Sequence, residues 1–218
     1  MNRSPATPMA SPSMAEMVAE FPTIAAAIRS PIPLFLTAIA AVWAGYHTGQ
    51  NPSLTLAYTL FAYLLSLLAV IDLRHGILPH ILTGFLALFG TLLAPTLGIT
   101  YTDSTLAALI AYGGLFLCAF ITTRLTGKES LGGGDLWLTL GLGTWLGLAA
   151  LPMLLIATAC TGILSALIKR WLTQNMLTYA GQGAAFPFGP ALCAAGWLAL
   201  LYAPAYWKGI EMLVAPAS

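Results

Sequence analysis

Residues 54–74 read LTLAYTLFAYLLSLLAVIDLR, a long uncharged run that ends abruptly in Asp72 and Arg74. A helix that crosses about 30 Å of hydrocarbon needs about 20 mostly apolar residues, and the run over residues 54–71 comes close to that length. The stretch therefore predicts a membrane-spanning helix with an acidic residue at its end.

The whole chain has the composition of an integral membrane protein. It contains 218 residues, of which 59% are hydrophobic and only 7% are charged, and its mean hydropathy is +0.86. A water-soluble globule of this size would need far more charge on its surface. The net charge of +1 excludes the basic face that nucleic-acid binding requires, so we expect no nucleic-acid partner.

Apolar runs recur along the chain and are separated by polar breaks. They predict an all-α, polytopic transmembrane helical bundle with about seven membrane segments, over residues 32–46, 54–71, 80–97, 104–122, 135–148, 150–168 and 188–206. We assign residues 31–218 to a single membrane-embedded domain. Residues 1–30 are rich in Pro, Ser, Ala and Met, which predicts a cytoplasmic tail that is disordered or forms a short interfacial helix.

The distribution of positive charge predicts the orientation. Cytoplasmic loops carry the excess of Lys and Arg, and a cytoplasmic N-terminus places seven of the eight such residues on that side. The seven are Arg3, Arg29, Arg74, Arg124, Lys128, Lys169 and Arg170, and Lys208 is the exception. The same topology brings Asp72 and Asp135 to the cytoplasmic face.

Asp72 and Asp135 are the candidate catalytic residues. Ionisable side chains near a bilayer are costly, so they indicate function and a partner. Two carboxyl groups that share one proton can hydrolyse a peptide, since one accepts a proton from water while the other donates one. The run Gly132-Gly133-Gly134 before Asp135 would let a substrate backbone approach closely, although such a run is also common in ordinary loops.

Three patches, in order, carry a family resemblance: DLRHGILP at residues 72–79, GKESLGGGDL at 127–136 and FPFGP at 186–190. The chain resembles the type IV prepilin peptidase family of GxGD membrane aspartic proteases. The resemblance implies an intramembrane endopeptidase that cleaves the basic leader from prepilins or pilin-like proteins at the cytoplasmic face of the bacterial inner membrane. The implied partners are these substrates and membrane lipid, and the oligomeric state stays open.

The resemblance also assigns individual residues. Asp72 matches the first catalytic aspartate and Asp135 the aspartate of the GxGD motif, whose glycines are Gly132 and Gly134. Glu129 is a candidate contact for a basic leader. The stretch Pro187-Phe188-Gly189-Pro190 either borders the substrate cleft or only opens a helix at the membrane surface.

The chain departs from long members of that family, which carry a domain with two CxxC pairs that accompanies N-methylation. Its three cysteines, Cys118, Cys160 and Cys193, form no CxxC pair, and the early apolar runs leave no room for such a domain. We therefore expect leader cleavage without N-methylation, no cofactor and no metal, even though His75 and His80 flank Asp72. The cysteines are expected to be small buried apolar residues.

Two other classes of function are compatible with acids in an apolar chain. A transporter or channel would use Asp72 and Asp135 to carry protons or cations, but it would favour acids deep within segments and an internal repeat. A noncatalytic scaffold for a pilus or secretion machine would not require either carboxyl group.

Overall fold

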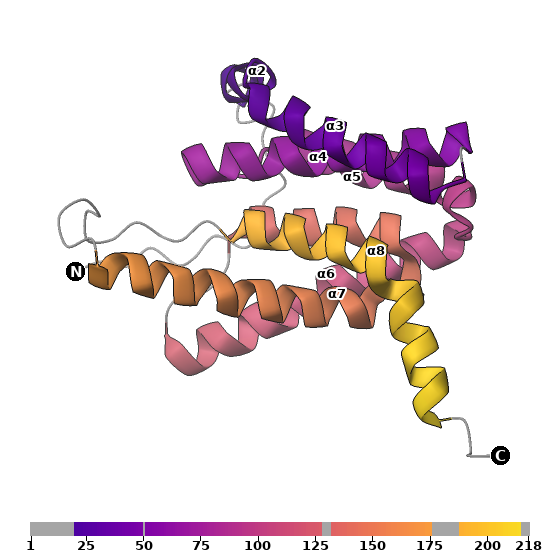
Figure 1. The fold of residues 1–218 in the computed structure, drawn as a ribbon. Helices are drawn as coiled ribbons and strands as arrows, with labels where there is room; N and C mark the ends of the chain where they lie inside the picture. The colour runs from indigo at the N-terminus through magenta and orange to yellow at the C-terminus, as the bar shows by residue number, and fades with distance from the viewer. Residues whose placement is uncertain (1–19, 50, 128–131, 176–187, 215–218) are drawn as a thin grey trace.

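The chain is described by a computed structural model that covers residues 20–49, 51–127, 132–175 and 188–214. The regular structure of these residues is entirely helical, as the sequence predicts. The helices are α2 (Phe21–Ile28), α3 (Pro31–His47), α4 (Pro52–His75), α5 (His80–Leu93), the 3₁₀ helix η1 (Ala94–Leu97), α6 (Tyr101–Thr126), α7 (Gly133–Asn175) and α8 (Gly189–Val214). In Figure 1, α3 and α4 lie side by side, and α8 lies between them and the second part of α7.

Four helical segments are long and apolar enough to cross a membrane: Pro52–His75, His80–Leu97, Tyr101–Leu125 and Gly133–Leu164. A fifth arises if α2 and α3 form one span, bent by 61° between them, and the apolar helix Gly189–Ala203 is shorter than these. The multi-pass helical bundle is thus confirmed. The count of seven segments and the cytoplasmic N-terminus stay predictions.

Helix α7 is interrupted at Gly147, which has φ 67° and ψ 173°. The break falls one residue before the end of the predicted run 135–148, next to the run 150–168. Contacts with α8 show that the chain doubles back there. In the first part of α7, Leu142 lies where a Cβ at Gly196 would meet it. In the second part, the Trp207 Nε1 donates to the Ala149 carbonyl at 2.6 Å and Thr161 contacts Ala191, so this part runs back along α8. Figure 1 shows the two parts of α7 running in opposite directions.

Helix α6 stabilises this reversal through Asp103. The backbone N–H of Leu148 donates to Asp103 Oδ1 at 3.3 Å. The Asp103 carboxylate thus accepts a hydrogen bond from an N–H at the start of the second part of α7, which has no partner within its own helix. A Cβ at Gly147 would lie 2.7 Å from Asp103 Oδ2, and its positive φ also disfavours side chains. Gly147 is therefore the residue that permits the turn.

The first part of α7, residues 133–146, is the centre of the bundle. The Trp145 side chain is fully buried, donates from Nε1 to the Leu86 carbonyl of α5 at 2.8 Å, and packs on Phe61 of α4 at 4.9 Å between ring centroids. Gly143 approaches α6 so closely that a Cβ would lie 2.6 Å from the Ala108 Cα. Helices α4, α5, α6 and α8 thus all pack on one short helix, which begins near Asp135.

A pair of glycine substitutions tests this close packing. Gly143→Ala should destabilise the fold by about 1–3 kcal/mol, because the new methyl group meets backbone that has no side chain to yield. Gly113→Ala on α6 is the matched control, since a Cβ there has nothing within 4 Å, and it should be neutral or slightly stabilising. Thermal unfolding in detergent measures both, and equal melting temperatures for the two variants would contradict the packing account.

Candidate active site

Asp72 lies in the last turn of α4 and is only 5% exposed. The helix ends because Gly76 adopts a left-handed conformation, with φ 65°, and its N–H donates to the Asp72 carbonyl at 2.8 Å. The backbone of Asp72 is therefore held by the cap of its own helix, and its carboxyl group can serve other segments.

Asp135 lies in the first turn of α7 and is 8% exposed. Its N–H donates to the Gly132 carbonyl at 3.2 Å, and its own carbonyl accepts from Thr139 Oγ1 at 2.8 Å. A carboxylate in the first turn of a helix is stabilised by the free N–H groups and the positive end of the helix dipole. The sequence thus places a buried acid where a helix terminus tolerates it.

The start of α8 contacts Asp72 directly. The Gly189 N–H donates to Asp72 Oδ2 at 3.0 Å, which joins residues 117 positions apart. A Cβ at Gly189 would lie 2.7 Å from the same oxygen, so a larger residue would displace the carboxylate. A helix N-terminus is a natural site for an anion, and here the anion is a side chain of the protein itself.

Leu78 packs between Gly134, in the first turn of α7, and Gly189, the first residue of α8. Its side chain is buried, and Cβ atoms placed on Gly134 and Gly189 would lie 2.8 Å from Leu78 Cβ and 3.2 Å from Leu78 Cδ2. The absence of side chains at both glycines lets α7 and α8 close around Leu78. This leucine is an apolar wall of the site that motif matching did not single out.

The contacts bring the two acids close together, because Gly189 binds Asp72 and Leu78 lies against both Gly189 and Gly134, the residue directly before Asp135. Cys193, one turn into α8, is also buried. Segments from α4, α7 and α8 therefore converge on one pair of acids. Such a pair can hold a water molecule between a carboxylate and a carboxylic acid.

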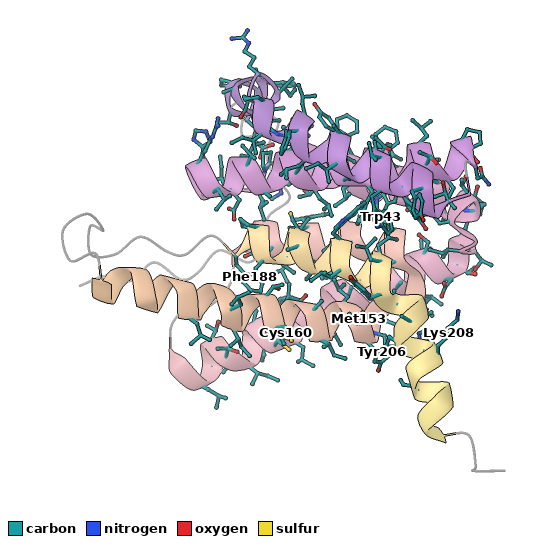
Figure 2. The ribbon with its side chains drawn as sticks, viewed as in Figure 1. Trp43, Met153, Cys160, Phe188, Tyr206 and Lys208 are labelled. Atoms are coloured by element: carbon teal, nitrogen blue, oxygen red, sulfur yellow. The ribbon has the colours of Figure 1, made fainter. Side chains whose placement is uncertain are left out.

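The remaining predicted site residues lie around this pair. Gly132 is exposed, and a Cβ there would lie 3.5 Å from Asp135 Oδ2, which is an ordinary contact. Phe188 is half-buried and lies at the start of α8, at the opposite end from Lys208 (Figure 2), and it packs against Gly162. Pro190 follows Gly189 on α8 and lines an apolar groove.

Glu129 and Pro187 lie outside the described residues. The prediction of buried cysteines is correct for Cys193 and wrong for Cys118 and Cys160, which are exposed because they lie on outward faces of α6 and α7. Among the residues that the structure describes, no three His, Cys, Asp or Glu side chains gather as a set that could hold a metal ion.

Glu20 connects the N-terminal segment to the site. Its carboxylate accepts from the N–H of His80 at 3.0 Å and of Ile81 at 3.3 Å, which satisfies two donors at the start of α5. Helix α2, which follows Glu20, packs on α4 with Ile24 and Ala27 buried. No sequence signal indicates this contact, because the two segments are 60 residues apart.

Removal of the Glu20 carboxylate should loosen the start of α5. We expect Glu20→Ala to lower local stability there by about 0.5–2 kcal/mol, as loss of a helix cap does. Hydrogen exchange of the His80 and Ile81 amides should accelerate roughly 2- to 30-fold, while the capped amide of Asp103 on α6 serves as an internal control. Unchanged exchange at His80 and Ile81 would show that the cap contributes nothing.

Comparison with known proteins places these features in a family. The model of the type IV leader peptidase family matches residues 59–167, which include both aspartates. The chain is 35% identical over 178 residues to a prepilin leader peptidase/N-methyltransferase of Aeromonas hydrophila, covering 80% of this chain and 58% of the relative. It is 29% identical to the protein of that name from Neisseria gonorrhoeae (84% and 61% covered) and 32% to that from Pseudomonas aeruginosa (80% and 58%).

The chain spans about three fifths of the length of these relatives. No solved structure matches it. The family match covers half of the chain and contains most of α4, all of α5 and α6, and most of α7, which form the greater part of the candidate site. On this evidence, the chain belongs to the type IV leader peptidase family.

Proposed function

We propose that the protein is an aspartic endopeptidase that removes the basic leader from type IV prepilins or pilin-like proteins at the cytoplasmic face of the bacterial inner membrane. The observation that carries the proposal is the convergence of Asp72 and Asp135, two buried acids from distant segments, within the region matched by the peptidase family. Buried like charges are costly, so a retained pair favours a chemical role.

The environments of the two acids support different roles. The Gly189 N–H donates to Asp72 and stabilises a negative charge there, and a charge on one acid of a close pair favours a proton on the other. We therefore assign Asp72 as the carboxylate base and Asp135 as the protonated acid. Water attacks the scissile carbonyl carbon while its proton passes to Asp72, and Asp135 donates its proton to the carbonyl oxygen. A tetrahedral diol results, with no covalent bond to the enzyme.

Collapse of the diol restores both groups. Asp72 gives its proton to the leaving nitrogen as the C–N bond breaks, and Asp135 recovers a proton from one hydroxyl of the diol. The products are the carboxylic acid of the leader and the free amino terminus of the mature protein. Each carboxyl group thus acts once as an acid and once as a base.

The relatives carry the name of an N-methyltransferase as well as that of a peptidase. The present chain has three cysteines and no CxxC pair. We propose that it cleaves the leader without methylating the new amino terminus. Mass spectrometry of the mature product reports both the cleavage position and any added 14 Da.

Substitution of either aspartate tests the mechanism. Asp72→Asn and Asp135→Asn should each lower cleavage of a membrane-inserted prepilin by about 10²–10⁴-fold, because each removes one partner of the proton exchange. Both variants should insert into the membrane at parental levels. Efficient processing by either variant would refute the two-aspartate mechanism, and proton-coupled flux lost in Asp135→Asn without any cleavage activity in the parent would favour a transporter.

A second pair of variants tests the contact between α8 and Asp72. Gly189→Ala should lower kcat at least tenfold with little change in KM, because the new methyl group displaces the Asp72 carboxylate rather than the substrate. Gly133→Ala is the matched control, since a Cβ there has nothing within 4 Å, and it should keep most of the activity. A fully active Gly189→Ala enzyme would show that catalysis does not require the close approach of α8 to Asp72.

A further inference from the structure

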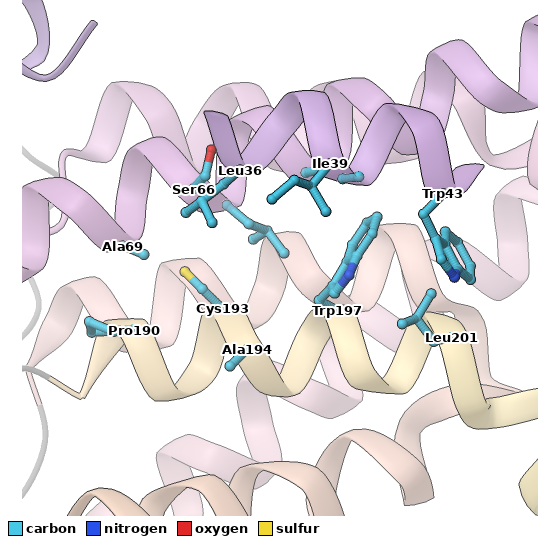
Figure 3. A pocket seen from close by; sticks show the side chains of 13 residues that line it. Leu36, Ile39, Trp43, Ser66, Ala69, Pro190, Cys193, Ala194, Trp197 and Leu201 are labelled. Atoms are coloured by element: carbon cyan, nitrogen blue, oxygen red, sulfur yellow. The ribbon is translucent and has the colours of Figure 1, made fainter. Parts of the chain in front are cut away.

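An apolar groove of about 440 Å³ lies between α3, α4 and α8. Its walls include Leu36 and Ile39 of α3, Leu65 of α4, and Ala194 and Leu201 of α8. Figure 3 shows Ile39 and Leu201 directed into the space between the helices. Helices α3 and α8 both pack on α4, so α4 forms the floor. Leu36, Ile39 and Ala194 are exposed, which leaves the groove open along its length.

One end of the groove lies next to the candidate active site. Pro190 and Cys193 line this end, and Pro190 directly follows Gly189, whose N–H donates to Asp72. Trp43 and Trp197 meet edge to face at the far end, with ring centroids 6.0 Å apart. A chain that leaves the acids in this direction therefore enters the groove.

The polarity of the groove restricts what can occupy it. Ser66 is the one hydroxyl residue on its walls, and Ser66 Oγ already donates to the Tyr63 carbonyl at 2.9 Å. An extended peptide would bury backbone N–H and C=O groups against this surface without partners, which is costly. A helix satisfies these groups internally and presents only side chains. The groove thus fits an apolar helix better than an extended strand.

We propose that this groove binds the apolar helical segment of the substrate that directly follows the scissile bond. The inference rests on the proposed function, which places the scissile bond between Asp72 and Asp135. From Pro190 to Leu201, α8 rises by about 16 Å, which matches about three turns of a second helix laid alongside it. The basic leader then extends away from the groove into water, and the apolar helix enters sideways from the membrane through the exposed edge of α3.

Disulfide cross-linking in an inactive enzyme tests this placement directly. Asp135→Asn keeps the substrate intact, and Cys118→Ser, Cys160→Ser and Cys193→Ala remove the native thiols. The probe is a type IV prepilin of Pseudomonas aeruginosa with a single cysteine moved through the first 16 residues after the leader. Ala194→Cys in the groove should form disulfides at substrate positions spaced three to four apart, at least tenfold more than Leu109→Cys, which lies on an exposed face of α6.

Each outcome decides a separate point. Equal cross-linking by Ala194→Cys and Leu109→Cys, or no helical period, would overturn the groove as a binding site and leave lipid as its occupant. Periodic cross-linking together with a parent enzyme that never cleaves this prepilin would support the groove and refute the proposed peptidase activity. Cleavage by the parent without cross-linking at Ala194→Cys would refute the groove alone.

A kinetic variant gives an independent readout. Ala194→Phe fills the groove without touching Asp72 or Asp135, so KM for the membrane-inserted prepilin should rise about tenfold while kcat stays within twofold. A change in kcat alone, or unchanged kinetics, would contradict the groove as the site that holds the substrate helix.

Discussion

The close packing of residues 133–146 against four other helices is the constraint on which the rest of the structure depends. In a lipid environment, helices gain little from burying apolar surface, so they associate through tight van der Waals contact and small residues at their interfaces. Gly143 lets the backbone of α6 approach closely, Gly141 leaves room for the Leu86 side chain of α5, and Leu142 fits against Gly196 of α8. The N-terminus of this central helix carries Asp135, so the packing also fixes one half of the candidate site.

The site itself is built from helix ends. Asp72 is at the C-terminal end of α4, Asp135 is in the first turn of α7, and Gly189 is at the start of α8. Acids at these positions avoid the bilayer centre and find backbone donors, which lowers the cost of burying two like charges together. Leu78 lies between Gly134 and Gly189 and fills the space that side chains at these two positions would occupy. An apolar groove begins beside these helix ends, at Pro190.

Much of this arrangement can be predicted from sequence, because hydropathy and motif spacing are local signals. The membrane-length apolar runs, the break near Gly147 and the placement of both acids at segment ends all follow from local composition. The contacts of Glu20 with His80 and Ile81 do not, since no pattern couples residues 60 positions apart. The exposure of Cys118 was missed for a related reason: in a membrane protein, apolar residues face lipid as readily as the core, so hydropathy does not reveal the direction of a side chain.

The proposed mechanism requires that Asp72 and Asp135 face one another across the junction of three helices. The most direct measurement is chemical bridging of Asp72→Cys and Asp135→Cys, introduced together after the native cysteines are replaced. A short bifunctional thiol reagent should link the two within one chain, with the bridge detected by mass spectrometry of the digested protein. Two cysteines that each react with a monofunctional reagent but never bridge would contradict the shared site.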